Sequence, residues 1–80
     1  MTNITYNVEH TDTFAGEANY SWVVRKSFEA PADASTPLLV RRAKALIGET
    51  GSRARTHDLG DTIQLDYPGR CVRTFITAEF

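Results

Sequence analysis

Hydrophobic and polar residues alternate along most of this chain, which is the pattern of β-strands buried on one face. The first such segment runs from Thr2 to His10 and places Ile4, Tyr6 and Val8 on one side. Alternation stops between Thr11 and Ala18, a stretch that contains Gly16, so we predict a connecting loop there. It resumes from Asn19 to Glu29, and the two strands are predicted to pair as a hairpin with a long loop. The inward positions of the second strand are Tyr20, Trp22, Val24 and Phe28.

A helical spacing follows the second strand. Thr36 is expected to cap a free N–H group, and Pro37 suits the first helical position because that N–H group would be unpaired anyway. We predict a helix from about Pro37 to Ile47, ended by Gly48 in a left-handed conformation. Its apolar face carries Leu39, Ala43, Leu46 and Ile47, with Val40 beside them. We expect Leu46 and Trp22 to be buried together between this helix and the sheet.

Three further strands are predicted after Gly51. Residues 52–58 are the most polar, which favours an edge position. Residues 62–67 point Ile63, Leu65 and Tyr67 inward, and the last strand, residues 72–80, places Val72, Ile76, Ala78 and Phe80 on one face. Turns are expected at residues 58–61 and at Pro68-Gly69. The order is ββαβββ, so the predicted fold is an α+β two-layer domain in which one helix covers one face of an antiparallel sheet.

Length, charge and cysteine content narrow the class of protein. Eighty residues predict a single small domain, and nine basic against ten acidic residues disfavour a generally basic nucleic-acid binder. No apolar run approaches the roughly 20 residues that span a bilayer, and no signal peptide is predicted at the N-terminus. Cys71 is the only cysteine, which excludes an intramolecular disulfide and fits a reducing cytoplasm. We interpret Cys71 as a small strand residue rather than a reactive thiol.

Residues that could carry catalysis are few. Neither His10 nor His57 has a metal-ligand spacing, and residues 48–52 lack the lysine of a phosphate-binding loop. His10, Asp12 and Glu17 could contact a hard cation, but a solvated acidic loop is the favoured interpretation. No Ser/His/Asp set is suggested by spacing, and a domain of this size rarely encloses a substrate pocket. We therefore expect a protein without cofactor or metal that is not an enzyme.

Charge is distributed unevenly. Residues 1–24 contain three acidic residues and no basic one, a net charge of −3, whereas residues 25–55 contain seven basic and three acidic residues, a net charge of +4. Residues 56–80 contain four acidic and two basic residues, a net charge of −2. The pattern fits either dispersal of charge for solubility or two recognition surfaces of opposite sign.

The face of the sheet away from the helix offers a second candidate surface. Its expected outward residues are Val23, Arg25, Arg73 and Phe75. Arginine beside an aromatic residue can stack nucleic-acid bases, can form a protein interface, or can be covered by a second copy of the chain. The low net charge favours a dimer or another protein partner over nucleic acid.

Two long stretches of the sequence support a family resemblance: His10-Thr11-Asp12-Thr13-Phe14 with the following Glu17–Val23, and Thr50–Thr56 with Gly60-Asp61. Together with Arg42-Ala43-Lys44, they resemble small proteins encoded by bacteriophages and prophages. Among these, the chain looks like an anti-CRISPR protein directed against a type I system, of which type I-C is a candidate. The resemblance covers nearly the whole chain but carries over no functional residue.

The resemblance implies a non-enzymatic inhibitor that acts in the cytoplasm of the infected bacterium. Its partner would be the Cascade surveillance complex, whose binding of target DNA it would block. An acidic surface suits the basic grooves of a complex that holds nucleic acid. We therefore predict partner binding by Glu9, Asp12, Phe14 and Glu17, with Phe14 as the aromatic anchor or else packed against its own hairpin. The alternative is a small nucleic-acid-binding regulator that uses the basic middle segment and the open sheet face.

Overall fold

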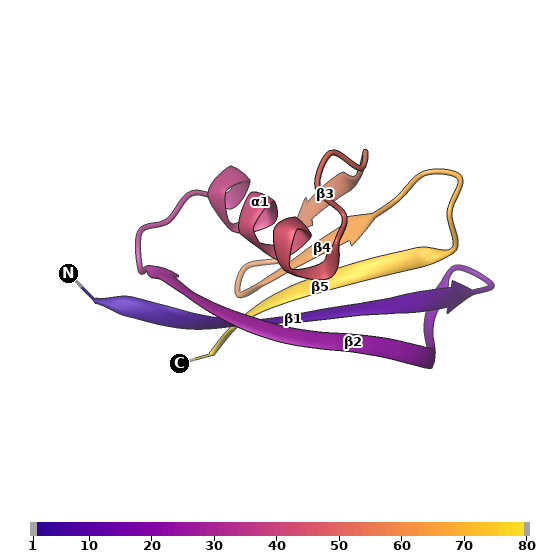
Figure 1. Cartoon of the computed structure of the whole chain (residues 1–80), viewed down its shortest axis with the longest axis horizontal. Coiled ribbons are helices and arrows are strands. Elements are labelled where there is room, and N and C mark those ends of the chain that lie inside the picture. Colours follow the sequence, from indigo (N-terminus) through magenta and orange to yellow (C-terminus); the bar gives the residue numbers. More distant parts are fainter. Residues whose placement is uncertain (1, 80) are drawn as a thin grey trace.

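Five strands and one helix, in the predicted order, form a two-layer α+β fold. The computed structural model describes residues 2–79. The elements are β1 (Asn3–Phe14), β2 (Glu17–Pro31), α1 (Thr36–Ile47), β3 (Arg55–Asp58), β4 (Thr62–Asp66) and β5 (Val72–Glu79). The strands form one antiparallel sheet in the order β2-β1-β5-β4-β3, and α1 lies across one face (Figure 1). The predicted fold class is confirmed.

The β1–β2 hairpin is longer than the sequence predicts. The expected loop over residues 11–18 is wrong, because the strands continue to a turn that consists only of Ala15 and Gly16. Both turn residues have positive φ, 55° and 83°, as a two-residue hairpin turn of the mirror-image type requires. The strand persists without alternation because β5 supports β1 from its other side, where Thr11 pairs with Arg73 and Asp12 with Val72.

A large bulge interrupts β2 opposite Asp12. The register passes from Thr11 opposite Val23 to Thr13 opposite Ala18, so residues 19–22 face a single residue of β1. Tyr20 accommodates this bend with a positive φ of 55°. The extra residues break the inward and outward alternation of β2 over residues 19–22, where the sequence predicts a regular strand with Tyr20 and Trp22 inward.

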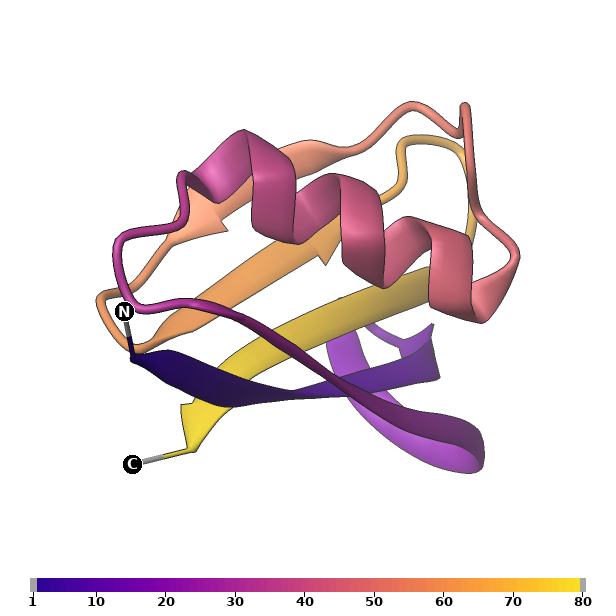
Figure 2. The ribbon, with the colours of Figure 1, turned by 60° about the vertical axis from the view of Figure 1, so that its left-hand side comes forward.

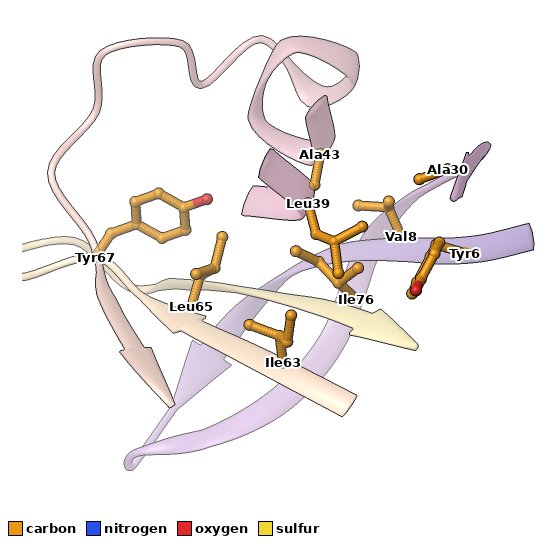
Figure 3. Close-up of a cluster of buried hydrophobic side chains, with 9 residues drawn as sticks. All are labelled: Tyr6, Val8, Ala30, Leu39, Ala43, Ile63, Leu65, Tyr67 and Ile76. Atoms are coloured by element: carbon orange, nitrogen blue, oxygen red, sulfur yellow. The ribbon is translucent and has the colours of Figure 1, made fainter. Parts of the chain in front are cut away.

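The hydrophobic core lies between α1 and the sheet. Leu39 and Ala43 point from the helix toward the strands (Figure 3). The remaining buried apolar residues come from the strands and the segments that follow them: Tyr6, Val8, Ala30, Ile63, Leu65, Tyr67 and Ile76. The inward positions predicted for residues 62–67 are thus confirmed, and Phe28 stacks on Tyr6 with ring centroids 5.5 Å apart. Phe80, predicted to share a face with Val72, Ile76 and Ala78, lies outside the described residues.

The expected burial of Trp22 and Leu46 is wrong. Trp22 is 43% exposed and Leu46 is 39% exposed. The molecule is 41 Å long, whereas a helix of 12 residues spans only about 18 Å, so α1 leaves the distal part of the hairpin uncovered (Figure 1). Trp22 lies in this part. Figure 2 shows the helix lying on one side of the sheet. Leu46 lies at the rim of the buried helix face, on the side of the edge strand β2. Arg42, one helical turn earlier on the same side, donates to the Glu29 carbonyl of β2 at 2.8 Å.

The ends of the helix and of the edge strand lie within a few residues of their predicted positions. Ser35, rather than Thr36, is the N-cap, and its Oγ accepts from the Leu38 N–H group at 3.4 Å. Gly48 ends the helix with a φ of 77°, as predicted. The strand predicted over residues 52–58 is shorter, because only Arg55–Asp58 pairs with β4, and it lies at the sheet edge as expected. Within residues 2–79, no helix combines the length and the apolar character needed to cross a membrane.

Candidate functional site

A buried polar cluster joins distant segments beside the C-terminal end of α1. His10 Nδ1 lies 2.8 Å from Thr74 Oγ1, which in turn lies 2.8 Å from the hydroxyl of Tyr67. On the other side of the ring, His10 Nε2 lies 3.3 Å from Glu49 Oε2. Arg70 donates two hydrogen bonds to the Glu49 carboxylate, at 2.7 and 2.9 Å. The cluster therefore links β1, β5, the segment after α1 and the β4–β5 turn.

The hydrogen bonds of this cluster form one consistent chain of donors and acceptors. An ionised Glu49 can only accept, so neutral His10 carries its proton on Nε2 and donates to it. Nδ1 then accepts from the Thr74 hydroxyl, which accepts from Tyr67. Within residues 2–79, no buried side-chain nitrogen or oxygen lacks a hydrogen-bond partner. The polar groups of the cluster are therefore buried without the free-energy cost of unsatisfied hydrogen bonds.

Burial and charge pairing shift the ionisation of the cluster. The bidentate hydrogen bonds from Arg70 hold the pKa of Glu49 at about 2, below its ordinary value of 4.5, although burial opposes this effect. Burial lowers the pKa of His10, an effect that the nearby Glu49 carboxylate only partly offsets. Burial also raises the pKa of the Tyr67 hydroxyl. Near neutral pH, the cluster therefore contains an anionic Glu49, a cationic Arg70 and a neutral His10.

The order hydroxyl, imidazole, carboxylate resembles that of a hydrolytic triad, but the geometry points to a structural role. Thr74 is completely buried, so its hydroxyl cannot reach a substrate in solution. Tyr67 and Trp22 enclose the His10 ring, with centroids at 5.7 and 5.4 Å. This cluster is not among the sites predicted from the sequence, although the inward positions of the polar residues His10 and Thr74 in their strands are a signal for it.

The stability of the protein is expected to fall as the pH decreases. A carboxylate whose pKa is lowered by folding stabilises the native state above its unfolded pKa, and this contribution is lost as the pH falls toward the folded pKa. For Glu49 the loss occurs between about pH 4.5 and pH 2. His10 also lowers the stability as the pH falls. Because its pKa is lowered by folding, the unfolded state binds the proton more readily than the native state below about pH 6.5. Urea unfolding followed by fluorescence from pH 7 to pH 2.5 measures this dependence, which Glu49→Gln should reduce below pH 4.5, while the contribution of Asp12 remains.

Asp12 organises the bulge and is not a freely solvated loop residue. Its carboxylate accepts from the Ser21 N–H at 2.9 Å, from Ser21 Oγ at 2.6 Å and from Asn19 Nδ2 at 3.0 Å. The Ser21 and Asn19 hydrogen bonds lower the pKa of Asp12 to about 2. Thr11 is fully buried, and its hydroxyl accepts from the Tyr20 N–H and donates to the Trp22 carbonyl. Charge reversal at Asp12 would therefore disturb the bulge as well as any binding surface, contrary to the expectation from a loop.

The cation site considered from the sequence does not assemble. His10 is buried in the polar cluster, Asp12 binds the bulge, and Glu17 is exposed beside the hairpin turn. Among residues 2–79, no three side chains of His, Cys, Asp or Glu are grouped closely enough to hold a metal ion. Cys71, expected within a strand, is exposed and lies just before β5.

The hairpin turn presents Phe14 and Glu17 at one end of the molecule. Phe14 is 74% exposed, so it does not pack against its own hairpin, and Glu17 is its cross-strand partner. Arg73 of β5 holds the turn in place, because its Nη2 donates to the Gly16 carbonyl at 3.0 Å while its Nε donates to Asp66 at 2.6 Å. The exposed aromatic ring and carboxylate therefore stand on a supported turn.

Glu9 lies away from the turn, in the middle of the open sheet face. It forms an ion pair with Arg25 at 2.9 Å and lies opposite Phe75 of β5. The second arginine of this face, Arg73, is bound to Asp66. Both arginines of this candidate surface, for which a dimer or another protein partner is favoured over nucleic acid, thus already have carboxylate partners, while Val23 and Phe75 are half-buried beside them.

Comparison with known proteins does not indicate which of these sites is functional, so we compare them by their geometry. No protein-family model, no curated protein and no solved structure matches the chain. The polar cluster encloses its reactive groups, and the open sheet face pairs its charges internally. The hairpin turn alone, among the sites predicted from the sequence, combines a large exposed aromatic side chain with an exposed carboxylate on a fixed support. It is the strongest candidate interaction site.

Proposed function

We propose that this protein is a non-enzymatic inhibitor that binds a bacterial defence complex through the β1–β2 hairpin turn. The resemblance to anti-CRISPR proteins supplies the partner, a type I Cascade complex in the cytoplasm of the infected bacterium. The exposure of Phe14 beside Glu17 on a turn anchored by Arg73 is the observation that carries the proposal. In this account, Phe14 enters a pocket of the complex and Glu17 faces basic residues that otherwise contact nucleic acid.

Two physical features support this use of the turn. Aromatic anchors at the centre of an interface supply much of the binding energy, and fixing the turn in advance reduces the entropy lost on binding. The negative charge of residues 1–24 would accelerate the encounter with a basic groove. Of the four residues predicted to bind the partner, Phe14 and Glu17 are proposed to make direct contact. Asp12 would act by holding the bulge, and Glu9 by its pairing with Arg25.

Binding of the purified protein to purified type I Cascade tests this proposal. We expect the wild-type protein to bind the complex and to reduce its binding of a matching fluorescent DNA duplex, because the turn and the DNA would compete for the same basic groove. Interferometry measures the first property and fluorescence anisotropy the second. The alternative nucleic-acid-binding regulator predicts the reverse result: no binding to Cascade, and a submicromolar affinity for DNA that falls steeply with added salt.

A further inference from the structure

A groove opens between the outer side of α1 and the edge strand β3, at the end of the strand order opposite to β2. It has a volume of about 590 Å³ and is lined by Thr36, Pro37, Val40, Arg41, Lys44, Gly51 and Thr56. Pro37 and Val40 contribute apolar surface, and the cationic side chains of Arg41 and Lys44 line it with them. The groove therefore combines a site for an apolar side chain with a positively charged border.

The backbone of β3 borders this groove, and within residues 2–79 its outer edge has no partner strand. β3 is the last strand of the sheet and pairs only with β4 among the described residues. All four of its residues are exposed. Its free edge offers N–H and C=O groups to an incoming extended chain, which is the geometry of peptide binding by strand addition.

The register of β3 determines what each side of an added strand would meet. Thr56 lies opposite the buried Leu65 and lines the groove on the helix side. Arg55 lies opposite Asp66 and therefore occupies the other face of the sheet. An added strand would thus direct alternate side chains into the groove and toward Arg55.

The charges around this edge favour an acidic ligand. Arg41, Lys44, Arg53 and Arg55 all belong to the segment of residues 25–55, whose net charge is +4. Arg41, Arg53 and Arg55 are exposed and form no ion pair among the described residues, whereas Lys44 donates to the Ser52 carbonyl at 2.6 Å. Asp58, the acidic residue of this strand, already accepts hydrogen bonds from Thr36 and from the Gly60 N–H.

We propose that the β3 edge and the α1–β3 groove bind an extended acidic peptide segment of a protein partner as a sixth strand. One set of its side chains is apolar and enters the groove over Pro37 and Val40, and the alternate set is acidic and faces Arg55. A free strand edge recognises a polypeptide backbone, which nucleic acid does not have, and the apolar lining has no counterpart on a phosphate chain. This surface is separate from the hairpin turn and does not depend on the function proposed for it.

A fluorescent octapeptide of alternating valine and glutamate provides the test. We expect the full-length protein to bind it at least about tenfold more tightly than a peptide of alternating valine and lysine, and more tightly than single-stranded oligothymidine. Methylation of every backbone nitrogen of the acidic peptide should abolish binding, because such a chain cannot donate hydrogen bonds to β3. Equal binding of the two valine peptides, preference for the oligonucleotide, or retained binding of the methylated peptide would each overturn the proposal.

Charge reversal locates the binding site on the protein. The double variant Arg41→Glu, Arg55→Glu should bind the acidic peptide at least about tenfold more weakly, while Lys26→Glu on the opposite edge strand should bind within about twofold of the wild type. Circular dichroism establishes that each variant is folded. Equal effects of the two variants would contradict the assignment. Phe14→Ala with Glu17→Lys should leave peptide binding unchanged. Failure of the proposal for the β3 edge can therefore be distinguished from failure of the proposal for the hairpin turn.

Discussion

Leu65→Ala is expected to lower the free energy of unfolding by about 3–4 kcal/mol, a large part of the stability of so small a domain. Leu65 of β4 is completely buried on the face of the sheet that α1 covers (Figure 3). Its removal leaves a cavity among residues that strands on both sides hold in place, since β4 lies between β5 and β3. Urea unfolding followed by fluorescence measures the loss as a shift of the midpoint.

Leu46→Ala is the matched control for this prediction. The same chemical change at Leu46 should cost less than about 1 kcal/mol, because the residue is 39% exposed at the rim of the helix. Equal losses for the two variants would mean that the helix contacts the sheet through a different face. The comparison therefore tests the packing of α1 as well as the burial of Leu65.

Glu49→Ala is expected to produce the second large effect, a destabilisation of about 2–3 kcal/mol at neutral pH. The substitution deprives His10, Ser52 and Arg70 of their common acceptor. His10 is buried and would lose the hydrogen bond at Nε2, whereas Arg70 is half-exposed and can be solvated. Because water can solvate Arg70, the expected loss of stability is smaller than for breaking a fully buried ion pair.

Asp33→Ala serves as the control for Glu49→Ala, since Asp33 is an exposed carboxylate in the segment between β2 and α1. It should change the free energy of unfolding by no more than about 0.5 kcal/mol. If Glu49→Ala were equally mild, the polar cluster would not join the segments around it. A loss of stability confined to Glu49→Ala would establish its structural role.

The sequence predicts those parts of the fold in which local pattern and tertiary packing agree. Ile63 and Leu65 alternate in a strand that has neighbours on both sides, and Tyr67 follows directly after it, so their inward parity survives folding. Gly48 ends the helix because a left-handed residue is needed there and glycine adopts that conformation without strain. At such positions the preference of the backbone and the demands of the core coincide.

Prediction fails where a tertiary partner or a length mismatch decides the outcome. Residues 11–14 lack alternation, yet β5 pairs with Thr11 and Asp12, and the hydrogen bonds of Asp12 stabilise a bulge that no local pattern indicates. Trp22 has the inward parity of its strand, but the helix is too short to cover it. The polar cluster unites residues such as His10 and Thr74 that are 64 positions apart, a proximity that only the sheet creates.

The most direct test of the proposed inhibitor is the affinity of hairpin-turn variants for purified type I Cascade. Phe14→Ala with Glu17→Lys removes the exposed ring and reverses the adjacent charge, while the bulge residues Thr11 and Asp12 and the Arg73 anchor remain intact. This variant should keep the wild-type unfolding midpoint and bind Cascade at least about a hundredfold more weakly. The control Arg53→Glu with Arg55→Glu, at the other end of the sheet, should bind Cascade like the wild type. Unchanged affinity of the turn variant, with binding lost only in the arginine variant, would contradict the account.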